Sequence, residues 1–298
     1  MVGSTTDAIA DGIIRSTGET AKISLAQVKL FNEVRSIERL ELLTASGQLV
    51  ATLLRRINTD TTDYKQTFEA QVQAEQQVTI PKDTDVRLVL RAVIRNTNNG
   101  GFSDELLQLR LFSVTLKGDT SCQSINIPLN GPFKKHQTSF GRITGVTRVS
   151  PATATLISGT DVVISSYSFS GSAIAGKNIK LRQLLFSVIK NGSVTVSDWK
   201  IVHRTSGVAV PCTINETTMT VTCFGLEQSI GQLTSTPLIL DLKATVNVPA
   251  SAQNSTLETS LEATGSPESL GSIEWTDESG VFRWIEGSSP IVKGTRLQ

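Results

Sequence analysis

The sequence predicts an all-β protein made of two tandem immunoglobulin-like antiparallel β-sandwich domains. Three observations lead to this prediction: apolar and polar residues alternate along short segments, turn-forming residues separate those segments, and the second half repeats the pattern of the first. The chain has 298 residues, of which 39% are hydrophobic and 18% charged, as in ordinary folded proteins. Each half is therefore long enough to bury its own core.

The internal repeat rests on two pairs of segments that occur in the same order in both halves. KISLAQVKLF aligns with NIKLRQLLFS and VRLVLRAVI with LILDLKATV, at residues 22–31, 178–187, 86–94 and 238–246. The sequence offset between the two aligned segments differs slightly from one pair to the other, as insertions in surface loops would produce. We therefore expect two homologous domains, residues 1–140 and 141–298. A polar connection that ends in Pro151 is expected near residues 140–154.

Each aligned segment has the two-residue period of a strand with one buried face. In VRLVLRAVI, Val86, Leu88 and Leu90 lie on one side and Arg87 lies on the other. Four more segments alternate in the same way, at residues 106–116, 161–170, 192–202 and 219–224. Gly, Asn, Ser and Pro separate these segments, so antiparallel sheets without intervening helices are expected.

One segment, FNEVRSIERLELL at residues 31–43, has features of a helix. Val34, Ile37 and Leu40 recur there at helical spacing. The corresponding part of the second half is rich in Val, Ser and Thr, which argues against a helix. We therefore expect a strand, with at most one helical turn.

The stretch AVPCTINETTMTVTCFG places Cys212 and Cys223 on either side of a polar, threonine-rich segment. A hairpin that turns between Thr217 and Thr218 would place the two cysteines directly opposite each other. Opposed Cβ atoms on antiparallel strands lie about 4.5–5.5 Å apart, and a disulfide needs about 3.5–4.5 Å, so a small adjustment permits the bond. A disulfide is the favoured interpretation, and it would indicate an oxidising compartment.

Three alternatives remain open for this pair: a zinc site, a redox dithiol and two buried thiols. Zinc needs four ligands, and only His203 is near enough in the sequence to be a third. A redox pair usually has the spacing C-x-x-C, which is absent. Cys122 has no evident partner, so we expect a buried thiol or a site of intermolecular pairing.

The composition argues against several partners. The net charge is +1 and the basic residues are scattered among acids, so neither nucleic acid nor an anionic membrane is expected. No segment reaches the ~18 apolar residues of a membrane span. The start of the sequence lacks the basic and apolar regions of a secretory signal. We expect either an intracellular protein or part of a longer exported chain, and the disulfide favours export.

The sequence predicts that the protein is not an enzyme and needs no cofactor. It contains no G-x-S-x-G, glycine-rich phosphate loop or H-E-x-x-H motif. His136 is expected on an exposed edge strand, and His203 is expected to be half-buried and hydrogen-bonded. The Asp-bearing turns at residues 58–63 and 81–85 could supply oxygen ligands for calcium, but they lack the pattern of a dedicated loop. Solvated turns are the favoured interpretation, and no metal site is predicted.

Two further groups of residues bear on binding and modification. The N-glycosylation triplets at Asn191, Asn215 and Asn254 fit exposed loops of an exported protein. Trp275 and Trp284 flank a turn, and stacked on an open sheet face they could bind a sugar. Packing across one hairpin or against the core is more common for such a pair and is favoured here.

Several motifs in the second half resemble a known family: VSPATATLISGTDVVI, NIKLRQLLFSV, PLILDLKATV, IEWTDESG and VFRWIEGSSPIVKGTRL. They are similar to the tandem immunoglobulin-like modules of surface proteins from candidate-phylum bacteria of the Patescibacteria type. The first half fits this pattern more loosely and lacks the closing "W.D.S" motif. The resemblance implies an extracellular, cell-surface or surface-layer role, and it carries over no catalytic residues.

The leading hypothesis is a non-catalytic extracellular structural protein of the cell surface. It would act as a rigid two-domain spacer, or assemble with copies of itself through edge strands into a surface layer, sheath or filament. One alternative is a carbohydrate-binding or adhesive module that binds glycan through Trp275 and Trp284. A virus or phage coat protein is a further alternative.

Overall fold

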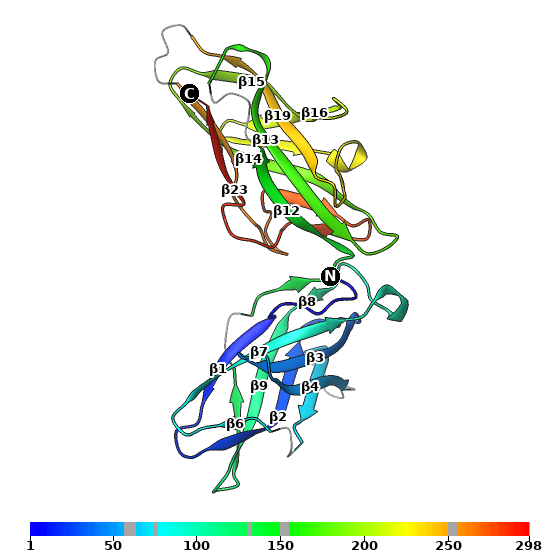
Figure 1. The fold of residues 1–298 in the computed structure, drawn as a ribbon, viewed down its shortest axis with the longest axis vertical. Coiled ribbons are helices and arrows are strands. Elements are labelled where there is room, and N and C mark those ends of the chain that lie inside the picture. Colours follow the sequence, from blue (N-terminus) through cyan, green and yellow to red (C-terminus); the bar gives the residue numbers. More distant parts are fainter. Residues whose placement is uncertain (57–63, 74–76, 130–132, 150–154, 250–254, 298) are drawn as a thin grey trace. The chain divides into compact units, whose positions relative to one another are not determined.

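The computed structural model describes residues 1–56, 64–73, 77–129, 133–149, 155–249 and 255–297. It forms two compact units, Met1–Ser139 (unit 1) and Phe140–Gln298 (unit 2; Figure 1). The all-β prediction is confirmed: besides strands, the described residues contain only two 3₁₀ turns, Thr97–Asn99 (η2) and Leu226–Gln228 (η3). No helix in the described part of the chain is long and apolar enough to cross a membrane.

Unit 1 is a β-sandwich whose two layers are joined through a shared strand. Its strands are β1 (Ala10–Arg15), β2 (Ala21–Leu30), β3 (Ile37–Thr44), β4 (Leu49–Arg56), β5 (Gln66–Gln71), β6 (Thr79–Ile80), β7 (Asp85–Ile94), β8 (Leu106–Leu107), β9 (Leu109–Gly118), β10 (Ser124–Pro128) and β11 (His136–Gln137). One layer has the order β1-β7-β3-β4 and the other β5-β2-β9-β10, with β6 beside β2. The expected strand within residues 31–43 is β3.

Strand β4 belongs to both layers of unit 1. Its first part pairs with β3 as far as Leu53, and from Leu54 onward it pairs with β5. The chain thus passes from one layer to the other within a single strand.

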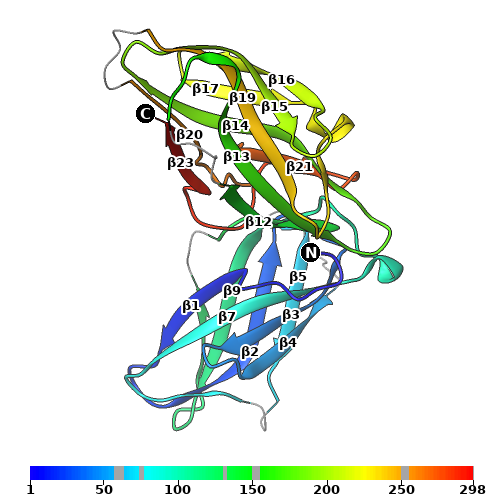
Figure 2. The same cartoon turned by 45° about the horizontal axis from the view of Figure 1, so that its top comes forward.

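Unit 2 has the same construction, with one more strand along the main path of its sheet. Its strands are β12 (Gly141–Val149), β13 (Gly159–Ala173), β14 (Ile179–Asn191), β15 (Thr195–His203), β16 (Ala209–Asn215), β17 (Thr220–Phe224), β18 (Gln232–Leu233), β19 (Leu238–Asn247), β20 (Thr256–Leu261), β21 (Ile273–Thr276), β22 (Val281–Phe282) and β23 (Val292–Leu297). The order is β12-β13-β19-β15-β16 in one layer and β17-β14-β20-β23 in the other, with β18 and β21 beside β14 (Figure 2).

The strand orders of the two units match position by position. If β1 corresponds to β13, β2 to β14 and β7 to β19, then every strand on the unit 1 path has a counterpart on the unit 2 path. The two aligned sequence pairs fall on these counterparts. Residues 22–31 and 178–187 cover most of β2 and the start of β14, and residues 86–94 and 238–246 cover most of β7 and β19.

The immunoglobulin strand order is not confirmed. In that order the first two strands are neighbours in one sheet. Here β1 pairs with β7, whereas β2 lies in the other layer between β5 and β9. Alternation along a strand identifies its buried face, but it carries no information about which distant strand will be its neighbour.

The expected polar connection between the halves is wrong in its first part. Residues Gly141–Val149 form β12, which pairs with β13 at the edge of unit 2. Its alternation is weak because a bulge lies between Ile143 and Gly145, and because an edge strand has few buried side chains. Pro151 lies outside the described residues.

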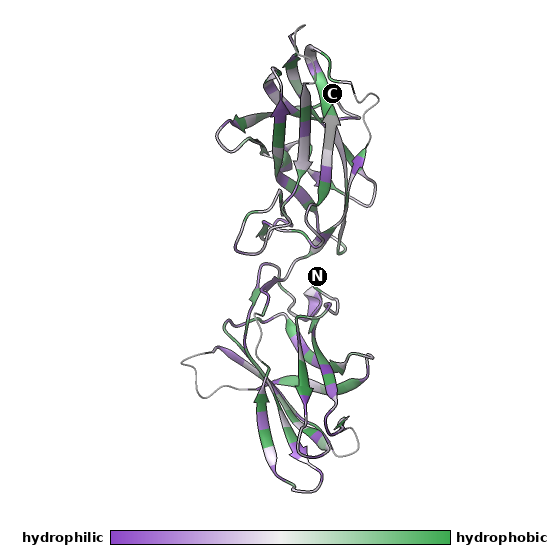
Figure 3. Ribbon diagram, turned by 90° about the vertical axis from the view of Figure 1, so that its left-hand side faces the viewer, coloured by the Kyte–Doolittle hydropathy of each residue, from purple (hydrophilic) through white to green (hydrophobic). Residues whose placement is uncertain are grey.

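Both cores lie between the layers, and hydrophobic residues alternate with hydrophilic ones along the strands (Figure 3). In unit 2, the Tyr167 ring lies 5.3 Å from the Phe186 ring, and both side chains are fully buried. The Tyr167 hydroxyl donates a hydrogen bond to the Thr259 carbonyl at 3.3 Å, which satisfies its polar end. Burial raises the pKa of Tyr167.

Candidate functional site

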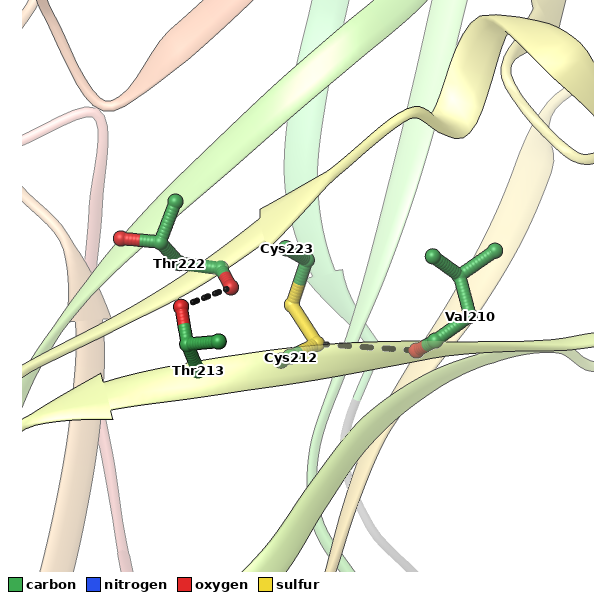
Figure 4. Close-up of a disulfide and its surroundings, with 5 residues drawn as sticks. All are labelled: Val210, Cys212, Thr213, Thr222 and Cys223. Carbon is green, nitrogen blue, oxygen red and sulfur yellow. Dashed lines mark hydrogen bonds between the residues drawn. A yellow bond between two sulfur atoms is a disulfide. The ribbon is translucent and has the colours of Figure 1, made fainter.

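The disulfide between Cys212 and Cys223 is present, and it lies where β16 changes layers (Figure 4). Ala209–Pro211 pair with β15, whereas Cys212–Asn215 pair with β17 in the other layer. Cys212 stands directly opposite Cys223, and Asn215 opposite Thr220, as the hairpin prediction required. The Cα atoms are 4.3 Å apart, near the separation of about 4.5 Å at non-hydrogen-bonded pairs. The bond therefore fixes the corner at which the two layers of unit 2 join.

The surroundings of this bond are those of a structural crosslink. Cys223 is fully buried, and Cys212 is half-buried with its Sγ atom 3.7 Å from the Val210 carbonyl oxygen. His203, the sequence candidate for a third zinc ligand, is half-buried, and its Nδ1 atom lies 2.6 Å from the Ser206 hydroxyl. The described residues contain no group of three or more side chains that could hold a metal ion.

Trp275 packs as the sequence favoured, and the alternative of an open sugar platform formed by the two tryptophans is not present. Trp275 is only 4% exposed, and its ring stacks on Phe282 with the ring centroids 4.2 Å apart. Its indole Nε1 donates a hydrogen bond to the Trp284 carbonyl at 2.9 Å. Trp275 thus packs into the core of unit 2 and offers no face to a ligand. Trp284 is half-buried, so part of its surface is accessible.

Sequence reasoning missed the role of Asp277, which is fully buried directly after β21. One carboxylate oxygen, Oδ2, accepts a hydrogen bond from the Phe140 amide at 2.7 Å. The other, Oδ1, accepts from the amides of Ser279 and Gly280 at 3.1 and 3.0 Å. Asp277 therefore shapes the turn before β22 and holds the first residue of unit 2. The signal was the sequence Asp-Glu-Ser-Gly directly after a strand, which is typical of a side-chain-capped turn.

A second buried carboxylate, Asp241, lies on β19. Its Oδ1 accepts hydrogen bonds from the Ser166 hydroxyl at 2.7 Å and from Arg204 Nη2 at 2.6 Å. Burial acts to raise the pKa of Asp241, but the hydrogen bonds from Arg204 and Ser166 and the charge of Arg204 outweigh it and lower the pKa. Asp241 thus joins β13, β19 and the turn after β15.

The lowered pKa of Asp241 predicts a loss of stability in acid. The carboxylate stabilises unit 2 above the unfolded pKa of about 3.9, and this contribution disappears as the pH falls through the lower folded pKa. We expect Asp241→Asn to reduce the free energy of unfolding by about 1–3 kcal/mol at neutral pH. Urea titrations should show that the difference between the proteins shrinks steadily below about pH 4. A difference that does not change with pH would contradict this role of the charge.

One cavity in unit 2 could hold a small molecule. It has a volume of about 240 Å³ and lies between the β12 bulge and the loop after Trp284. Its lining includes the apolar residues Ile143, Ile285 and Ile291 and the polar residues Thr264, Glu286 and Ser288. No lysine or arginine is among the lining residues, so the cavity offers hydroxyl groups and one carboxylate but no cationic side chain.

The remaining predicted sites lie apart from one another. Asn191 and Asn215 are exposed; the Asn191 amide donates to Thr256 Oγ1, and Asn215 Oδ1 accepts from the amides at the following turn. Asn254 and the Asp-bearing turn at residues 58–63 lie outside the described residues. Cys122 is exposed, so the expectation of a buried thiol was wrong; it follows β9 in a tight turn and has a φ of 56°.

Comparisons with known proteins leave the family open. No family model matches the chain, and no curated protein matches it. Solved structures that align with it include the C-terminal domain of the Streptococcus agalactiae AgI/II polypeptide BspA, with 11% identity over 92% of this chain and 84% of that one and a TM-score of 0.22. The collagen adhesin of S. aureus aligns with 9% identity over 98% of this chain and 91% of that one, with a TM-score of 0.20. Superpositions this loose carry no argument about function, which therefore rests on the chain's own residues.

Proposed function

We propose that this protein is a non-catalytic extracellular structural protein of the cell surface. Its two sandwich units act in series as a rigid spacer or as the subunit of a surface layer, sheath or filament. The observation that carries the proposal is the Cys212–Cys223 disulfide at the layer crossing of unit 2. Disulfides of this structural kind persist in oxidising compartments and are rare where thiols are kept reduced.

The matched strand orders support a second part of the proposal, that the chain is a tandem repeat of two homologous domains. A shared strand order together with two aligned sequence pairs is more simply explained by duplication than by two independent origins. Tandem sandwiches are suited to a spacer, because each unit has its own core and adds length without needing a ligand. The resemblance to tandem surface modules of Patescibacteria-type bacteria agrees with this setting.

Surface labelling tests the proposed location. Antibodies raised against the purified protein should label intact cells of the producing organism as strongly as permeabilised cells. Alkylation of the protein after denaturation without reduction should leave Cys212 and Cys223 unmodified and label Cys122, which serves as the internal control. Labelling only after permeabilisation, with all three thiols alkylated, would refute an extracellular role.

The cavity beside the β12 bulge favours a second candidate function, binding of a neutral sugar. Hydroxyl groups, one carboxylate and an aliphatic surface suit a polyhydroxylated ring, and the partly accessible Trp284 precedes the lining residues Ile285 and Glu286. We expect a glycan array to retain the wild-type protein, with signal reduced at least about tenfold by Glu286→Gln or Trp284→Ala. Thr213→Ala, on the distant β16, is the matched control. Absence of retention by the wild-type protein would end this candidate.

A further inference from the structure

The backbone of β1 has one side that no other described strand covers. On the neighbouring strand β7, the Arg87 carbonyl accepts a hydrogen bond from Ala45 at the end of β3, so the backbone groups of Arg87 point toward β3. Backbone groups alternate in direction along a strand, so Arg87's neighbours Val86 and Leu88 point toward β1. They pair there with Ile14 and Gly12.

It follows that the alternate residues of β1, Asp11, Ile13 and Arg15, point their backbone groups away from β7. β1 is the terminal strand of its layer in the described part of the chain. These three residues therefore present amide and carbonyl groups that can pair with an added strand.

Unit 2 shows a strand in the corresponding place. Leu88 of β7 and Leu240 of β19 are aligned in the sequence repeat. Leu88 pairs with Gly12 of β1, and Leu240 pairs with Tyr167 of β13. Gly12 therefore corresponds to Tyr167, and the next residue, Ile13, corresponds to Ser168. In unit 2, Ser168 pairs with Thr147 of β12 in an antiparallel ladder (Figure 1). This edge of the sandwich therefore accepts an antiparallel strand in one unit and lacks one, among the described residues, in the other.

The side chains of β1 indicate which strand fits. Ile13 is 63% exposed, and Asp11 and Arg15 lie on the same outer face with opposite charges at equal distances along the strand. A two-fold axis through Ile13 would place Asp11 opposite Arg15 of a second copy and Ile13 opposite Ile13. Slipping the pairing by two residues separates the charges, and slipping it by one turns the side chains to opposite faces. The strand is thus complementary to itself in one register.

We propose that β1 pairs antiparallel with β1 of a second copy of this chain, about a two-fold axis at Ile13. This pairing deepens the proposed structural function, on which it rests, by naming the edge used for assembly. The three outward-facing residues of each strand would form about six backbone hydrogen bonds. Because the contact is isologous, it closes at two copies and does not by itself build a fibre.

Charge exchange provides the test, using the full-length protein in sedimentation velocity runs over a range of concentrations. The wild type should dimerise, and Ile13→Lys should weaken the dimer at least about tenfold because it places like charges on the axis. Asp11→Arg and Arg15→Asp should each remain monomeric, because each opposes like charges. An equimolar mixture of these two variants should form a heterodimer, because the two arginines on β1 of one copy then face the two aspartates on β1 of the other.

Thermal melts control for folding, since Asp11 also pairs with Arg87, and Arg15 with Asp85. A wild type that stays monomeric at every concentration overturns the proposal, as does a dimer that Ile13→Lys leaves unchanged. A mixture that fails to dimerise also overturns the stated register. None of these outcomes affects the surface labelling above, so a monomeric protein on intact cells would refute the β1 pairing and leave the spacer function standing.

Discussion

Asp277→Ala is expected to lower the melting temperature of unit 2 by roughly 6–12 °C, which corresponds to about 3 kcal/mol for a unit of this size. The substitution removes a fully buried carboxylate and leaves the amides of Phe140, Ser279 and Gly280 without their acceptor. Buried donors without a partner cost more than the net value of the hydrogen bonds they lose. Differential scanning calorimetry measures the effect.

Asp277→Asn is the matched control for this prediction. Asparagine keeps one acceptor oxygen and nearly the same volume, so it should cost less than alanine. The same melting temperature for both variants would mean that the retained volume and a single acceptor oxygen contribute nothing, so that the loss comes from the missing carboxylate. A shift of less than about 1 °C for Asp277→Ala would contradict the role assigned to this residue.

Replacing both members of the disulfide, as Cys212→Ala with Cys223→Ala, is expected to reduce the free energy of unfolding by about 3 kcal/mol. The bond closes a sequence separation of 11 residues, and its loss restores conformational freedom to the unfolded chain. Alanine is the suitable replacement because Cys223 is fully buried, and a serine hydroxyl there would need a partner. Urea unfolding measures the change.

Two comparisons distinguish the effect of losing the disulfide from the effect of changing the cysteine side chains. Wild-type protein unfolded in the presence of a reductant should lose about as much stability as the double variant. Cys122→Ser should change the stability by less than about 0.5 kcal/mol, because Cys122 is exposed and outside the disulfide. Equal stability of the oxidised and reduced wild type would show that the crosslink contributes nothing.

The sequence identified those features that depend on neighbouring residues. In residues 86–94, Leu88, Leu90 and Ala92 are fully buried, as the alternation predicted, because the period of a strand fixes which side chains share a face. The opposed cysteines were predicted for the same reason, since the register of a short hairpin follows from its turn.

Features that depend on distant residues could not be predicted in this way. Nothing local to β1 shows that it pairs with β7, or that residues 141–149 are an edge strand and not a connection. Packing was favoured for Trp275, but the sequence left an open platform as an alternative. The stacking on Phe282 and the hydrogen bond to the Trp284 carbonyl, which decide between the two, depend on how the hairpin packs. The role of Asp277 was missed because its hydrogen-bond partner Phe140 is 137 residues away in the sequence.

The position of the disulfide has a consequence for the mechanics of a spacer under tension. The bond closes a span of only 11 residues, which when extended would measure about 36–40 Å. Pulling unit 2 open would therefore release almost its whole contour length, even with the bond intact. The disulfide holds β16 and β17 together where the two layers join, so it resists the first step of unfolding under force. It does not limit how far the chain extends once unit 2 has unfolded.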